Sequence, residues 1–219
     1  MNKEMKKFFQ NLVEAPSPSG FEQPAQEVYR KFTAPYADEI KTDVHGNVIA
    51  LKKGTGKLKF MVVGHADEIG LMVNYIDENG FIRFLPIGGV DTGLLPGSRV
   101  DIYGKENKLY RGVIGRKPIH VLKPDERSKA TKIEDLWIDI GAKDKKDAET
   151  KVEIGSHITF SKGMEMLSKD IVTTKATDNK AGVYIVGALL KELGDEKIVP
   201  NIYMMTWRSL RLTGSTSFI

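Results

Sequence analysis

The hydrophobic pattern at the start of the chain predicts two helices separated by a short break. The break is Pro16–Gly20, because proline and glycine interrupt a helical pattern. Pro24 suits the first turn of the second helix, since a proline there loses no helical hydrogen bond. Apolar side chains recur at helical spacing on both sides of the break: Met5, Phe8, Phe9, Leu12 and Val13 before it, and Ala25, Val28, Tyr29 and Phe32 after it.

Three strands are predicted next. The first two cover residues 39–42 and 47–51, and the turn formers of Asp43–Asn47 join them. The third, Leu58–Val63, is apolar without alternation, which is typical of a central strand covered on both faces. This strand leads directly to His65.

The pattern then changes to short β-prone segments that end only near residue 162. Such closely spaced strands predict a small β-barrel or sandwich. Helical spacing returns in Asn179–Leu193, and a last strand is predicted over Ile198–Thr206. The predicted segments between the two parts are Leu71–Ile76, Phe81–Leu85, Arg99–Tyr103, Leu109–Ile114, Leu136–Ile140 and His157–Phe160.

This order predicts an α/β layer domain interrupted by an inserted β domain. The ranges are 1–70 for the first part of the α/β domain, 71–165 for the insert and 166–219 for the second part. In the returning helix the predicted buried stripe is Ala181, Tyr184, Ile185, Ala188 and Leu189.

Composition narrows the class of protein. The 219 residues are 41% hydrophobic and 28% charged, as in a globular protein, and no apolar run has the length of a signal peptide or a membrane span. We therefore expect a soluble, cytoplasmic protein without membrane contacts. The net charge of +4 comes from charges that alternate in sign, which does not favour nucleic-acid binding. With no cysteine, any metal ion must be held by His, Asp or Glu.

Candidate metal chemistry follows the third strand and precedes the later helix. His65 and Asp67 are two apart, so on an extended segment their side chains point the same way and can form a ligand and its orienting partner. Asp178 opens the helix-patterned segment, where a helix N-cap is the other interpretation. Together the three predict a metal site where ligands collect in α/β proteins, at the carboxyl ends of strands.

Other polar residues are interpreted as structural. We expect His45 to be a turn residue and Glu68 and Glu165 to be solvated. His120 and His157 have no companion at ligand spacing, so we interpret them as structural or interface residues.

These motifs resemble the M42 family of dinuclear metallo-aminopeptidases. The family is also called tetrahedral, glutamyl or deblocking aminopeptidases, and many members were labelled endoglucanase or cellulase. The likeness runs from about residue 5 to Thr206. It rests on Gly64–Gly70 and Lys175–Gly182, with further landmarks in Pro16–Glu22, Asp43–Asn47 and Gly115–His120.

The resemblance implies a fold, a cofactor and roles for the site residues. The fold is a three-layer α/β/α metallopeptidase domain, incomplete here, with an inserted small β-barrel that builds dimers and a dodecamer. His65 would bind one of two zinc or cobalt ions ~3.5–4 Å apart, Asp178 would bridge both, and Asp67 would orient His65 as part of the catalytic machinery. The substrates would be peptides that lose their N-terminal residues.

The chain departs from the family pattern after Thr206. The family has a Gln-Glu-Glu segment here, with the general base and a ligand, and further on an Asp and a His. This chain has Trp207–Ile219 instead. Trp-Arg-Ser written TGG-AGG-AGC contains GAG-GAG, so a frameshift would convert Glu-Glu into this tail; a different natural terminus and an artificial one are the rivals. We therefore expect a C-terminally truncated, inactive polypeptide.

Three functions follow from the sequence. The first is an M42-type metallo-aminopeptidase by descent whose chain is incomplete. The second is a noncatalytic oligomerising or metal-binding remnant built around the β insert. The third is a glycoside hydrolase, which ranks last because the adjacent Asp67 and Glu68 point to opposite sides of an extended chain instead of facing each other across a sugar cleft.

Overall fold

The chain divides into two compact units. The computed structural model describes residues 2–124, 129–194 and 196–207. One unit comprises Met1–Glu68 and Gly163–Ile219, and the other, Ile69–Lys162, is inserted between these two segments in the sequence. The predicted fold class, an α/β layer domain with an inserted small barrel, is confirmed. The catalytic and dimerising roles assigned to the parts stay predictions.

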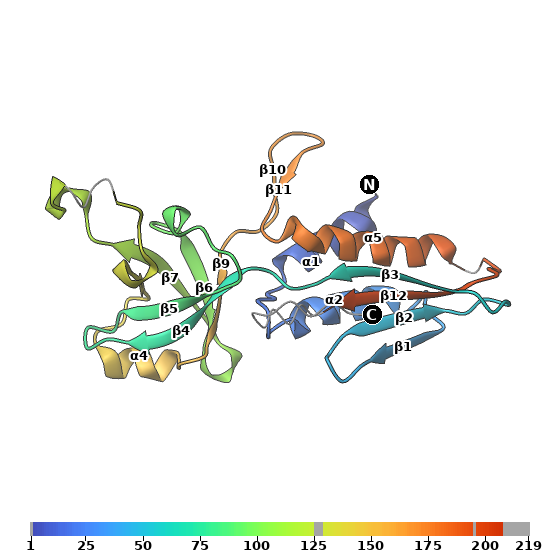
Figure 1. Ribbon diagram of the computed structural model, residues 1–219, viewed down its shortest axis with the longest axis horizontal. Coiled ribbons are helices and arrows are strands. Elements are labelled where there is room, and N and C mark those ends of the chain that lie inside the picture. The colour runs from blue at the N-terminus through green and yellow to red at the C-terminus, as the bar shows by residue number, and fades with distance from the viewer. Residues whose placement is uncertain (1, 125–128, 195, 208–219) are drawn as a thin grey trace. The chain divides into compact units, whose positions relative to one another are not determined.

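The first unit combines helices with a four-stranded sheet (Figure 1). The sheet has the order β1-β2-β12-β3, in which β12 runs antiparallel to β2 and parallel to β3. The elements are α1 (Lys3–Glu14), α2 (Gln23–Thr33), β1 (Glu39–Thr42), β2 (Val48–Lys52), β3 (Lys59–His65), β10 (Glu165–Met166), β11 (Val172–Thr173), α5 (Thr177–Leu193) and β12 (Asn201–Trp207).

Helices α1, α2 and α5 share one hydrophobic core with the sheet. Alternate residues of the strands enter this core, as the period of a strand requires, including Ala50 of β2 and Met204 of β12. Phe8 of α1 stacks on Phe32 of α2 with 3.7 Å between ring centroids. Gly187 of α5 makes room for this pair, because a Cβ there would lie 2.8 Å from the Phe8 ring.

Strand β3 is not the covered central strand that its apolar run predicted. Within the described residues it pairs only with β12 and lies at an edge of the sheet. Phe60, Met61 and Val63 are 55%, 59% and 40% exposed. The prediction was wrong because β12 is the only described strand that pairs with β3, and an apolar run does not reveal on how many sides a strand is paired.

Helix α5 also buries a different set of positions from the predicted stripe. Ile185 and Leu189 are 59% and 38% exposed, whereas the buried positions are Lys180, Val183, Val186, Gly187 and Leu190. The helix carries apolar residues on several faces, so its periodicity is weak. Packing against β3, β12 and the other two helices then selects the buried face.

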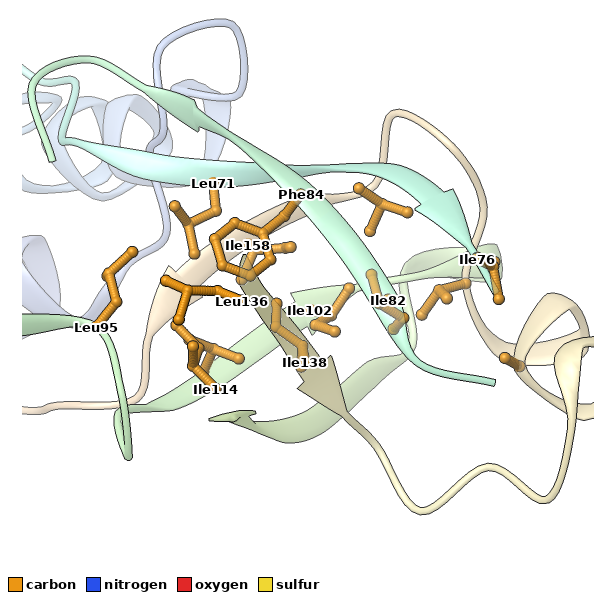
Figure 2. Close-up of a cluster of buried hydrophobic side chains, with 14 residues drawn as sticks. Leu71, Ile76, Ile82, Phe84, Leu95, Ile102, Ile114, Leu136, Ile138 and Ile158 are labelled. Atoms are coloured by element: carbon orange, nitrogen blue, oxygen red, sulfur yellow. The ribbon is translucent and has the colours of Figure 1, made fainter. Parts of the chain in front are cut away.

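The second unit is a closed six-stranded barrel with the order β4-β5-β8-β7-β6-β9. Its branched side chains fill the interior (Figure 2). A bulge between Val73 and Tyr75 shifts the register of β4, and Ile76 is again buried in the core. The elements are β4 (Gly70–Ile76), β5 (Ile82–Ile87), η1 (Thr92–Leu94), β6 (Arg99–Tyr103), η2 (Lys105–Asn107), β7 (Leu109–Arg116), η3 (Ile119–Val121), η4 (Ile133–Asp135), β8 (Leu136–Asp139), α4 (Lys145–Lys151) and β9 (His157–Phe160).

Candidate metal centre

The end of β3 lies against the first turns of α5. Gly64 permits this approach, because a Cβ at that position would lie 2.6 Å from the backbone nitrogen of Val183. His65 is the last residue of β3, and Asp178 lies at the start of α5. The close packing of strand and helix therefore brings together two residues that are 113 positions apart.

The structure places all three predicted site residues in contact. Nδ1 of His65 lies 3.0 Å from Oδ1 of Asp67, and Nε2 lies 3.2 Å from Oδ1 of Asp178. The Asp67 side chain is 10% exposed and that of Asp178 is 96% exposed. One ring nitrogen thus meets a buried carboxylate and the other meets a carboxylate in solvent.

This arrangement suits a ligand with an orienting partner. A proton on Nδ1 donated to Asp67 leaves the lone pair of Nε2 available for a cation. Tetrahedral ligands at the bond lengths of zinc, ~2.0–2.2 Å, lie about 3.4 Å from each other. The separation between Nε2 of His65 and Oδ1 of Asp178, 3.2 Å, is close to that value.

Asp67 is held from a second direction by the segment between α1 and α2. The hydroxyl of Ser19 donates a hydrogen bond of 2.6 Å to Oδ2 of Asp67. Pro18 forms an isolated parallel bridge with Glu68, so the segment runs beside the end of β3. Both oxygens of the Asp67 carboxylate therefore have a partner.

Glu68 is buried, which corrects the prediction that it is solvated. It is 5% exposed, and its Oε1 accepts a hydrogen bond of 2.8 Å from the backbone N–H of Ser17. The same oxygen lies 3.2 Å from Nζ of Lys175 and 3.5 Å from Nζ of Lys180. Lys180 also donates to the carbonyl of Ala15 at 2.7 Å.

Lys180 is fully buried, and burial shifts the pKa of its ammonium group. Burial lowers the pKa of Lys180 to about 8, while the nearby Glu68 carboxylate acts in the opposite direction. The ammonium form therefore still predominates at neutral pH, in which state it pairs with Glu68. Sequence reasoning missed Ser17, Ser19, Lys175 and Lys180, whose only signal was their position inside the quoted motifs.

The remaining candidates take no part in the contacts described above. Glu165 is exposed, as predicted, and His45 occupies an exposed turn in which its N–H donates to Asp43. His120 belongs to η3 and His157 to β9, both in the barrel unit.

The described donors are fewer than a complete metal site needs. Across residues 2–124, 129–194 and 196–207, no three His, Asp or Glu side chains are grouped to hold a metal ion. His65 and Asp178 fit as two ligands, whereas zinc takes roughly three or four protein ligands. The predicted aberrant tail begins at Trp207, the last residue of β12, and its other residues lie outside the described part of the chain.

Comparison with known proteins identifies the family to which the chain is similar. The profile of the M42 glutamyl aminopeptidases matches residues 46–207. The lysyl aminopeptidase of Pyrococcus furiosus is 33% identical over 190 residues, which are 85% of this chain and 54% of the relative. The chain spans about half the length of the curated relatives it matches.

Solved structures agree with the profile. A TET aminopeptidase from a marine-sediment Thaumarchaeota archaeon has a TM-score of 0.91 at 29% identity, covering 97% of this chain and 61% of the other. The TET1 peptidase of Pyrococcus horikoshii has a TM-score of 0.81 at 30% identity, covering 92% of this chain and 60% of the other. That peptidase assembles into a tetrahedron or a large octahedral shell.

Proposed function

The chain belongs to the M42 glutamyl aminopeptidase family, and on this premise we propose that it carries part of the metal centre of an aminopeptidase that releases N-terminal residues from peptides. The observation that supports this most directly is His65 held between Asp67 and Asp178 at 3.0 and 3.2 Å. The buried carboxylate orients the ring, and the exposed carboxylate lies where a cation is accessible from solvent.

Each residue has a distinct role in this proposal. His65 would hold a divalent ion through Nε2, Asp178 would hold metal through its carboxylate, and Asp67 fixes the ring and tautomer of His65. Divalent ions held there, zinc or cobalt, would supply polarisation of the scissile carbonyl and a water of lowered pKa. Ser19 keeps Asp67 in place through its hydroxyl.

The described residues alone do not complete such a centre. They supply two donors, and a general base for the water is also required. We propose that the 219 residues by themselves turn over peptides poorly or not at all. The two-donor count favours the second candidate function, a noncatalytic metal-binding or oligomerising protein.

A glycoside hydrolase has no support from the site. Asp67 contacts His65 and Ser19, and Glu68 contacts two lysines, so both carboxylates are buried and engaged within the protein. Opposed carboxylates across an open sugar cleft are what that reaction needs.

Self-association through the barrel is the proposed mode of assembly. The assemblies formed by the Pyrococcus horikoshii peptidase support it, and a dimer would be the corresponding state here. None of the helices in the described part of the chain is long and apolar enough to cross a membrane. We propose a cytoplasmic location with peptides as partners, and neither nucleic acid nor a membrane as a ligand.

Metal titration tests the proposal. Co²⁺ is titrated into the 219-residue protein, with heat and visible absorption as readouts, and compared with His65→Ala, Asp178→Asn and the control His45→Ala, which changes an exposed turn. Saturable binding that is lost in the first two variants and kept in the control is the expected result. Equal binding by all four proteins would place the metal elsewhere.

A further inference from the structure

Asp178 depends on its neighbours for its position. Its side chain is 96% exposed and lies 3.2 Å from His65, so it is not locked in place by packing. The backbone around it also departs from helical geometry, at Asp178 and Asn179 and in the left-handed conformation of Ala176. Regular helical hydrogen bonding therefore does not set where this carboxylate lies.

Glu68 contacts the chain on both sides of Asp178. Its Oε1 lies 3.2 Å from Nζ of Lys175, which precedes Asp178, and 3.5 Å from Nζ of Lys180, which follows it. The side chains of Glu68, Lys175 and Lys180 are 3%, 11% and 0% exposed. Because these charges are shielded from water, removing one partner leaves the others buried without compensation, which is costly.

The same carboxylate connects this segment to the residues that hold His65. Glu68 follows Asp67 directly, and its Oε1 also accepts from the backbone N–H of Ser17. Lys180 donates to Ala15, so the segment before α2 is tied to the start of α5 as well. Three stretches of chain that are distant in sequence thus meet at one carboxylate group.

We propose that Glu68 is a positioning residue of the metal centre: through Lys175 and Lys180 it holds the Asp178 segment at ligand distance from His65. The proposal rests on the proposed metal-binding function and adds a residue that contacts neither the ring of His65 nor the carboxylate of Asp178. The side chain acts on the metal site only through the loop that it holds.

The test uses Glu68→Gln in the 219-residue protein. Glutamine keeps the shape and the acceptor for Ser17 but removes the charge that pairs with the lysines. Its matched control is Glu4→Gln, which removes the charge from an exposed ion pair between Glu4 and Lys191, at the other end of α5. Hydrogen exchange of the amides of residues 175–181 is measured first without metal, with the barrel amides as an internal reference, and Co²⁺ affinity is measured second.

In Glu68→Gln we expect exchange of the 175–181 amides to quicken by about tenfold or more, and Co²⁺ affinity to fall by about tenfold, as for other residues that orient metal ligands. The barrel amides and the control variant should match the wild type in both measurements. Unchanged exchange at residues 175–181 in a folded Glu68→Gln protein would overturn the proposal.

Two further outcomes are distinguishable. If the wild type binds no Co²⁺, the proposed metal function fails, while the exchange data still decide whether Glu68 holds the Asp178 segment. If Glu68→Gln does not fold, the same measurements on Lys175→Met test the proposal. This substitution removes the ion pair between Lys175 and Glu68 and leaves the buried pair of Glu68 and Lys180. Faster exchange localised to residues 175–181 supports the proposal, and wild-type exchange opposes it.

Discussion

Ser19 and Asp67 are joined by a hydrogen bond of 2.6 Å, although 48 positions separate them in the sequence. The hydroxyl of Ser19 donates to Oδ2 of the Asp67 carboxylate, and Nδ1 of His65 lies 3.0 Å from the other oxygen, Oδ1. Asp67 is thus fixed from two sides, as a residue that sets the orientation of a metal-binding histidine should be.

We expect Asp67→Asn to weaken Co²⁺ binding by about 10–100-fold, because an amide orients the imidazole less firmly than a carboxylate does. The measurement is a titration at fixed pH. Asp135→Asn serves as the control, since Asp135 is exposed and belongs to the barrel unit. Identical affinities of the wild type and Asp67→Asn would show that Asp67 has no orienting role.

We expect the purified 219-residue protein to release no appreciable amount of N-terminal amino acid from peptides in the presence of zinc or cobalt. The reason is that the described residues provide two donors where roughly three or more are needed. Release of free amino acids from a set of short peptides is the assay. Robust turnover that disappears in His65→Ala would contradict this expectation and show that the remaining groups come from the tail or from a second subunit.

Gly64→Ala should destabilise the first unit by ~1–3 kcal/mol, because the added methyl would lie 2.6 Å from the backbone of α5. Gly89→Ala is the matched control, since a Cβ there meets nothing within 4 Å. Unfolding in urea is followed by the fluorescence of Trp207 in a Trp137→Phe background, which leaves one of the 2 tryptophans. Equal midpoints for the two alanine variants would show that the packing of β3 on α5 is looser than described.

The barrel should lose stability as the pH falls below about 6.5. Burial lowers the pKa of His157 below its ordinary value of 6.5, so between these two values the unfolded chain binds more protons than the folded chain. Protonation therefore favours unfolding in this window, and the loss is complete below the folded pKa. We expect the urea midpoint of Trp137 fluorescence to fall less from pH 7.5 to pH 5 in His157→Gln than in the wild type, whereas the control His120→Gln should behave like the wild type.

We expect the barrel to self-associate through a two-fold interface in which both copies use the same surface. Sedimentation velocity over a range of concentrations, on the whole chain and on residues 69–162, measures this. A dodecamer is not expected from this chain. A strictly monomeric barrel fragment at high concentration would exclude the dimer-forming role.

Local patterns predicted where the elements lie, but not how they pack against each other. The six predicted strands between Leu71 and Phe160 match β4 to β9 closely, because alternation and turn residues are local properties. The edge position of β3 and the buried face of α5 were missed. Both depend on which strands and helices that are distant in sequence pack against β3 and α5. The apolar residues of β3 suit an edge or a central position, and those of α5 suit more than one buried face.

The candidate site shows the same division. The convergence of His65, Asp67 and Asp178 could be predicted from their residue types and spacing, and their metal-binding role stays a prediction. The burial of Glu68 could not, since its partner Lys175 is 107 positions away. A charged residue after an apolar run is usually solvated, and only the fold shows that two lysines meet it.

The pairing of β4 with β9 has an evolutionary consequence. Leu71 lies opposite Ile158, so the chain enters and leaves the barrel through neighbouring antiparallel strands. A module whose two ends emerge side by side can be gained, exchanged or removed at one point of a host protein without separating the host segments. The residues of the candidate site, from Ser17 to Glu68 and from Lys175 to Lys180, all belong to the first unit, into which the barrel is inserted. The barrel can therefore be remodelled or replaced while the residues of the candidate site stay in the unit that it interrupts.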